Sequence, residues 1–356
     1  MRQERPRPHK WRMAAAAAIL AATTNETGKR RMNGATRFGR RPLLAALAAA
    51  CVPGAARAQA FPSGRVTFVV PFPPGASTDI STRIVADRLA QMWGQPVLID
   101  NKGGANGIIA AEAVMRAKPD GYTVLATSSM THAGNPSLYE KLSYDAIKDF
   151  EPITRFSLVP MVVLVANGLG VASLGELTAK LKAEPGKHAF GAGAVSARVA
   201  SELYKMLIGS DALFVGYKNN QQAINDIQSG RLSFMIIDLV SAKGMADNGY
   251  AKAIAVTQPT RVASLPDVPT TAEAGLPALV FTTWSGFYVP RRTPREIVLK
   301  LNKDIIAAGT SPETAARLDA LGGSRDFTTP EEFAAFTASE LEAWRKVIRA
   351  ADIRAE

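Results

Sequence analysis

From Phe61 onward, apolar and polar positions follow two alternating rhythms. Short apolar runs rich in β-branched and aromatic residues, such as 66–70, predict buried strands. Between these runs, segments such as 79–93 place apolar residues on one helical face, which predicts amphipathic helices. Strands alternating with helices predict an α/β fold.

The same patterns predict strands and helices along the rest of the chain. We expect strands at 66–70, 97–99, 122–126, 161–165, 187–191, 214–217, 234–237, 253–256 and 284–289. We expect helices at 79–93, 107–117, 173–183, 196–208, 223–229, 294–308, 313–321 and 330–350. No internal repeat or long low-complexity linker interrupts the pattern.

The chain has 356 residues, which is long for one core and predicts about two domains. Two α/β units without a flexible linker fit two lobes joined by chain crossings, with a ligand cleft between them. We expect one lobe to comprise 61–162 and 283–356, and the other 163–282. Residues 1–60 precede both.

The net charge of +11 is concentrated at the amino terminus. Residues 1–58 hold 12 of the 42 basic and 2 of the 31 acidic residues, so the remainder has a net charge of only +1. That balance argues against a nucleic-acid partner. Arg40 and Arg41, the apolar run 42–52 and the small residues at 56–60 predict an export signal, with a basic tail as the alternative. Met32 is a second candidate for the start.

Few residues are available for catalysis or for binding a metal. The one cysteine, Cys51, lies within the predicted signal, where lipid anchoring is the minor alternative to a free periplasmic protein. His132 and His188 are the only histidines beyond the signal, and motifs of metalloproteases, serine hydrolases and nucleotide-binding loops are missing. We therefore expect no enzyme activity, no metal and no cofactor.

Three loops that follow strands are candidates for ligand binding. The segment 71–79 contains three prolines and Gly75 and leads into a helix, whose first N–H groups attract anions. The alternative is an ordinary turn in which Ser77, Thr78 or Asp79 caps the helix. The hydroxyl-rich segment 127–132 and the glycine-bearing segment 190–196 follow other strands, with helix capping as the alternative for the former.

The mature chain resembles the substrate-binding proteins of tripartite tricarboxylate transporters, known as the Bug family. The resemblance covers about 61–348. It is carried by short segments in a fixed order: 70–72 with Gly75 and Asp79, 101–107, 118–122, 132–139, 144–150, 217–218, 266–275 and 293–294.

The resemblance implies an α/β fold of the periplasmic-binding-protein type II class, with two lobes that close like a Venus flytrap. It implies a small carboxylate ligand (a di- or tricarboxylate, an acidic amino acid or an aromatic acid) that is delivered to the membrane subunits of a tripartite transporter. A sensor for a membrane signalling partner is the alternative. The implied ligand-binding residues are Phe72, Pro74, Gly75, Ala76, Ser77, Thr78, Asp79, Thr127, Ser128, Ser129, Ala192, Ser196, Tyr217, Lys218, Asn219 and Asp238.

Three residues near the implied cleft depart from the family pattern. Ala76 replaces a usual glycine, which restricts the backbone if that position requires a positive φ. Asn219 also replaces a glycine, and Arg198 replaces a histidine. Arg198 fits either a carboxylate partner or a solvated helix face.

Overall fold

The computed structural model describes residues 61–321 and 324–354. The predicted export signal, its cleavage site and Cys51 lie outside this range. Within it, no helix combines the length and the hydropathy that crossing a membrane requires. The prediction of an α/β fold is confirmed.

The strands form one extended sheet in the order β2-β1-β3-β9-β4-β7-β5-β6, with β10 and β8 paired to β4 outside this path. Their bounds are β1 Val66–Val70, β2 Val97–Asn101, β3 Thr123–Ser128, β4 Phe150–Val165, β5 Ala189–Ala192, β6 Leu213–Gly216, β7 Phe234–Asp238, β8 Lys252–Val256, β9 Thr282–Pro290 and β10 Ser324–Arg325.

The helices fill the intervals between these strands. They are α2 Ser77–Trp93, α3 Ile108–Met115, α4 Asn135–Leu138, α5 Leu174–Ala183, α6 Val195–Ile208, α7 Asn220–Gln228, α8 Leu239–Asp247, α9 Arg295–Thr310, α10 Pro312–Asp319 and α11 Pro330–Ala350. Short helical turns lie at η2 Ala105–Gly107, η3 Met130–Gly134 and η4 Asn167–Leu169, of which η3 is π-helical.

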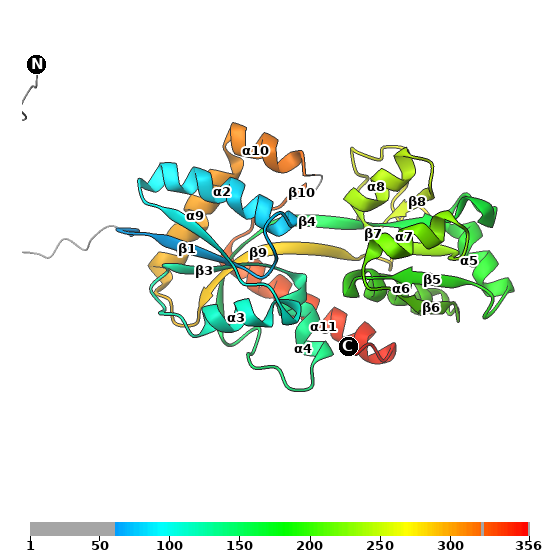
Figure 1. Ribbon diagram of the computed structural model, residues 1–356, viewed down its shortest axis with the longest axis horizontal. Coiled ribbons are helices and arrows are strands. Elements are labelled where there is room, and N and C mark those ends of the chain that lie inside the picture. Colours follow the sequence, from blue (N-terminus) through cyan, green and yellow to red (C-terminus); the bar gives the residue numbers. More distant parts are fainter. Residues whose placement is uncertain (1–60, 322–323, 355–356) are drawn as a thin grey trace, which may run out of the picture. The chain divides into compact units, whose positions relative to one another are not determined.

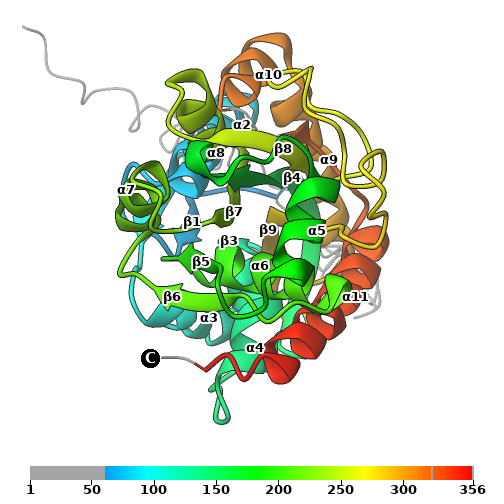
Figure 2. The same cartoon turned by 90° about the vertical axis from the view of Figure 1, so that its right-hand side faces the viewer.

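The long strand β4 divides the sheet into two parts. Its segment from Phe150 to Pro160 pairs with β9, and the segment from Met161 to Val165 pairs with β7 and β8. We call the part with β1, β2, β3 and β9 the first lobe, and the part with β5 to β8 the second lobe. Figure 1 shows β4 and β9 running from one to the other, and Figure 2 faces the second lobe. The exact residue bounds of the lobes remain a prediction.

Apolar burial explains why the sequence pattern was informative. The parallel strand β1 is almost entirely buried between β2 and β3, and β4 is buried throughout from Pro160 to Val165. In the second lobe, Phe190, Tyr204 and Phe234 pack their rings together. Strands covered on both faces read as continuous apolar runs, as these do.

Three segments differ from the sequence prediction. Strand β4 begins at Phe150 rather than at residue 161. Its first half was not predicted because Pro152 and Pro160 interrupt the apolar pattern and the pairing with β9 shifts register twice. Helix α8 was not predicted. Strand β3 extends to Ser128, so Thr127 and Ser128 belong to the strand rather than to a loop after it.

Candidate functional site

A cavity of about 650 Å³ lies where elements of both lobes meet. That volume falls within the range of small-molecule sites. The first lobe contributes the β1–α2 and β2–α3 turns and the end of β3, and the second lobe contributes the starts of α6 and α8. The middle of β4, the start of β9, the end of α10 with the segment that follows it, and Trp344 complete its wall.

Helix α2 begins at this cavity without a capping side chain. Its N-cap residue is Ala76, whose methyl group cannot accept a hydrogen bond. Among the described residues, the amide groups of Ser77, Thr78 and Asp79 have no acceptor. Ser77 and Thr78 line the cavity. The alternative of an ordinary turn in which Ser77, Thr78 or Asp79 caps this helix is therefore wrong.

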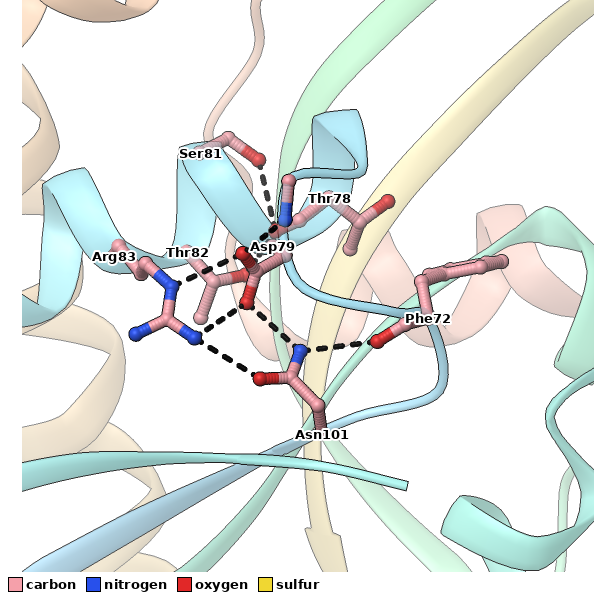
Figure 3. Close-up of polar contacts among 8 residues, drawn as sticks. Phe72, Thr78, Asp79, Ser81, Thr82, Arg83 and Asn101 are labelled. Carbon is pink, nitrogen blue, oxygen red and sulfur yellow. Dashed lines mark hydrogen bonds and ion pairs between the residues drawn. The ribbon is translucent and has the colours of Figure 1, made fainter. Parts of the chain in front are cut away.

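The carboxylate of Asp79 holds the turn before the helix instead. It is 1% exposed and accepts hydrogen bonds from the Gly75 amide at 2.9 Å and from Asn101 Nδ2 at 2.8 Å. Arg83 adds an ion pair at 3.0 Å, and Asn101 Nδ2 also donates to the Phe72 carbonyl at 2.9 Å. Figure 3 shows this network. None of these contacts involves the amides of Ser77, Thr78 or Asp79.

Burial raises the pKa of Asp79, but the hydrogen bonds from Arg83, Asn101 and Gly75 outweigh it, so the pKa lies below its usual value. Asp79 therefore stays ionised and fully engaged in the turn. This makes it a residue that shapes the site without lining the cavity.

The backbone of the turn resolves the question raised by Ala76. Its φ is −67° and its ψ is 154°, an extended conformation that any residue adopts. The left-handed residue is Gly75, with φ of 88°. Ala76 therefore imposes no backbone strain; it removes only the possibility of a side-chain cap.

Helix α6 begins at the cavity in the same way, from the second lobe. Its N-cap is Ala194, which also provides no side-chain hydrogen bond, and Val195 and Ser196 line the cavity. The preceding Gly193 lies so close to the start of α7 that an added Cβ would be 1.9 Å from the Asn219 backbone. Its amide donates to Asn220 Oδ1 at 3.0 Å, which fixes this turn.

An open helix start is not by itself the mark of a site. Helices α9 and α10 also lack a side-chain cap, and their first residues do not line the cavity. Helix α3 is uncapped too, but only its N-cap Gly107 lines the cavity, whereas α2 and α6 line it with residues of their first turns, from opposite lobes. Each contributes the positive end of a helix dipole.

Hydroxyl groups supply further donors. Six residues that line the cavity have side-chain hydroxyls that make no hydrogen bond within the described residues. They are Ser77, Thr78, Ser129, Ser157, Ser196 and Ser285. Hydroxyls and free amides can bind a carboxylate without bringing a charge of their own. In the part of the chain described, no cluster of three acidic, histidine or cysteine side chains is placed to hold a metal ion.

The predicted site residues separate into two groups. Seven of them line the cavity: Phe72, Ser77, Thr78, Ser128, Ser129, Ser196 and Asp238. The others lie beside it without lining it: Pro74, Gly75, Ala76, Asp79, Thr127, Ala192, Tyr217, Lys218 and Asn219. Whether either group contacts a ligand remains a prediction.

Several members of the second group have structural partners. Tyr217 donates to Asp226 Oδ2 at 2.7 Å, and Asn219 caps α7 by accepting from the Gln222 amide at 3.1 Å. Thr127 is fully buried and shares a hydrogen bond with Thr131 at 2.7 Å. Arg198 stacks its guanidinium 4.1 Å from the centre of the Phe214 ring and does not line the cavity.

Sequence reasoning missed the parts of the wall that are distant along the chain. These include Asn106, Val159, Trp284, Arg325 and Trp344. The glycine-rich segment around Asn106 was noted as a motif but was not assigned to the site. Both tryptophans are 1% exposed.

The histidine nearest the site is a structural one. His132 is fully buried, stacks on Tyr288 with ring centres 3.9 Å apart, and shares a hydrogen bond with Thr131. Burial lowers the pKa of His132 to about 3, so the ring is neutral. It supports the turn after β3 and has no access to the cavity.

Comparison with known proteins places this geometry in a family. The model of the tripartite tricarboxylate transporter family receptor matches residues 81–353. A protein of Pseudomonas sp. (strain P51), described as the UPF0065 protein in the tcbD-tcbE intergenic region, is 34% identical over 87% of this chain and 94% of its own length. BugT of Bordetella pertussis is 31% identical over 85% of this chain and 94% of its own.

Two similar solved structures hold a ligand. Rpa4515 of R. palustris, with adipate, is 32% identical, covers 83% of this chain and 99% of its own, and superposes with a TM-score of 0.70. MatC of Rhodopseudomonas palustris, with bound malate, is 30% identical, covers 81% of this chain and 100% of its own, and has a TM-score of 0.65. The expected two-lobed periplasmic-binding fold is thereby confirmed.

Proposed function

Because this chain belongs to the tripartite tricarboxylate transporter receptor family, we propose that it captures a small carboxylate outside the cytoplasm and delivers it to a membrane transporter. The family is one of binding proteins rather than enzymes, so the chain is a receptor. What we propose is the class of ligand, the membrane transporter as partner and the location outside the cytoplasm.

One observation carries the carboxylate assignment: two uncapped helix starts, those of α2 and α6, line the same cavity from opposite lobes. Free terminal amides and the helix dipole both favour an anion. A carboxylate between them would accept hydrogen bonds from both lobes at once. Binding would thereby favour the closed arrangement of the lobes, since only that arrangement offers both sets of donors.

The ligands of related proteins support the same assignment. Adipate and malate are both small organic acids, and they occupy two structures that share about a third of their residues with this chain. Capture by amides and hydroxyls needs no metal or cofactor, and the lining hydroxyls of Ser129 and Ser285 are free to take part.

Delivery to a transporter follows from the family and from the expected export signal. A receptor outside the cytoplasm needs a membrane partner to move its ligand inward. Two membrane subunits of a tripartite transporter are the partner proposed here, recognising the closed form of the lobes.

A thermal-shift screen tests the binding function. The chain from Phe61 onward is mixed with a panel of mono-, di- and tricarboxylic acids, with nucleotides as the control class. An acid at a hundred times its dissociation constant stabilises the protein by about 2.7 kcal/mol. We expect at least one acid and no nucleotide to raise the melting temperature. If no acid in a broad panel does so, and calorimetry agrees, the proposal is wrong.

A further inference from the structure

The charged residues around the cavity indicate which acids it can bind. Arg325 is the one basic residue among the described residues that line it. Its guanidinium is already paired with Asp319, with Nε–Oδ1 at 2.6 Å and Nη2–Oδ2 at 3.1 Å. This two-pronged ion pair occupies the Nε–Nη2 edge of the guanidinium and offsets its charge, while Nη1 makes no hydrogen bond among the described residues. The wall therefore offers no unpaired cation to a ligand with several negative charges.

Another helix start at the cavity is closed by the protein's own carboxylate. Helix α8 begins after Asp238, which lines the cavity and whose Oδ1 accepts from the Ser241 amide at 2.9 Å. Among the described residues, Asp238 Oδ2 has no partner. Where α2 and α6 present free amides, α8 thus presents a negative charge. A ligand carboxylate placed there meets repulsion.

Part of the remaining wall is apolar and open. Phe72 and Met130 from the first lobe and Val195 and Val240 from the second line the cavity and are not fully buried. Val240 lies two residues after Asp238 and is 55% exposed. Exposed apolar side chains that face one hollow are typical of a binding site for an apolar group.

Building on the proposed function, we infer that this cavity prefers an acid with one carboxylate and an apolar body of aromatic or alkyl size. We infer further that Asp238 is the residue that disfavours a second carboxylate. The single carboxylate binds at the open starts of α2 and α6. The body lies against the apolar side chains of both lobes, and Asp238 faces its uncharged end.

Matched ligand pairs test this inference by isothermal titration calorimetry. Hexanoate is compared with adipate, and 4-methylbenzoate with terephthalate, since each pair differs by one carboxylate on a similar frame. The wild-type protein should bind the monocarboxylate at least tenfold more tightly in at least one pair. A preference for the dicarboxylate in both pairs would overturn the inference while leaving the proposed function intact.

The variant Asp238→Asn tests the residue itself. Asparagine is also a good N-cap, so α8 keeps its hydrogen bond to the Ser241 amide while the charge is lost. The ratio of dicarboxylate to monocarboxylate dissociation constants should fall at least tenfold, through tighter binding of the dicarboxylate. An unchanged ratio would overturn the role given to Asp238.

A control on the same helix separates local charge from net charge. Asp247 pairs with Lys243 at 2.6 Å, is exposed and does not line the cavity. Asp247→Asn should leave the ratio within twofold of wild type, and an equal effect of both variants would contradict the local role of Asp238. If none of the four acids nor any acid of the thermal-shift panel binds, the proposed function fails together with this inference.

Discussion

The first turns of α2 and α11 differ in whether their terminal amide groups are hydrogen-bonded. At α11, the Thr329 hydroxyl accepts from the Glu332 amide at 3.2 Å, and the Glu332 carboxylate accepts from the Thr329 amide at 2.8 Å. At α2, the N-cap is Ala76 and the acid of the first turn, Asp79, reaches back past the N-cap to the Gly75 amide. Helix α11 therefore uses terminal amides in hydrogen bonds to its own side chains, whereas α2 leaves its terminal amides free.

The difference shows how a helix start can be held in place while its terminal amides still lack hydrogen-bond acceptors. The turn before α2 is anchored by Asp79, Arg83 and Asn101, so it does not need an N-cap to stay in place. Its terminal amides remain available because the anchoring carboxylate is directed elsewhere. A helix that uses its acid in a capping box, as α11 does, has fewer free amides left for an anion.

Removing the anchor should have the largest effect on stability. Asp79→Ala leaves the Gly75 amide and Asn101 without their buried acceptor, and hydrogen bonds to charged groups contribute about 1.5–3 kcal/mol. We expect the free energy of unfolding to fall by about 2–3 kcal/mol, measured by urea denaturation. The exposed Asp87 on the same helix, 3.6 Å from Arg317, is the control, and Asp87→Asn should change stability by less than about 1 kcal/mol. Equal losses in the two variants would refute the anchoring role.

Acid should remove this anchor reversibly. The pKa of Asp79 is lowered in the folded protein, so its stabilising effect is present above the unfolded-state value of 3.8 and is lost as the pH falls through the folded-state value. The difference in unfolding free energy between wild type and Asp79→Asn should therefore be constant from pH 7 to about 5 and shrink below pH 4. A difference that grew on acidification would mean that the carboxylate is not held ionised by its partners.

Removing the cap of α11 should cost less and should not affect binding. Thr329→Ala eliminates one half of the capping box, a change that typically costs about 1 kcal/mol. Thr329 does not line the cavity, so the dissociation constant for the best acid should stay within twofold of wild type. A tenfold loss of affinity would mean that the closed helix start also serves the ligand.

The sequence predicted most elements because central strands such as β1 and β7 are buried on both faces and the helices have one buried face. The runs at β1 and β7 and the amphipathic pattern of α6 left little choice. The first half of β4 was missed because two prolines and a register shift hide a strand that forms only against β9. Its existence depends on a partner more than a hundred residues away.

The site was predictable only in part, for a related reason. The loops after β1 and β5 follow strands and precede helices, and this local pattern identifies Ser77, Thr78 and Ser196. The wall formed by Val159, Trp284 and other distant residues arises from tertiary packing, which no local pattern reveals. One signal was available and unused, namely alanine at the residue before each of the two helices, where a capping residue is usual.

The most direct test of this account is to close the open start of α2 and measure stability and binding together. Ala76 has the extended backbone that an N-cap requires, so Ala76→Asp should cap the helix and raise the free energy of unfolding by about 0.5–1 kcal/mol. The same carboxylate occupies the amides and repels an acid, so calorimetry should show at least tenfold weaker binding. Ser173→Asp, which exchanges one cap for another at α5 away from the cavity, should leave affinity unchanged. A stabilised Ala76→Asp protein that binds its acid as tightly as wild type would contradict the claim that these amides receive the ligand.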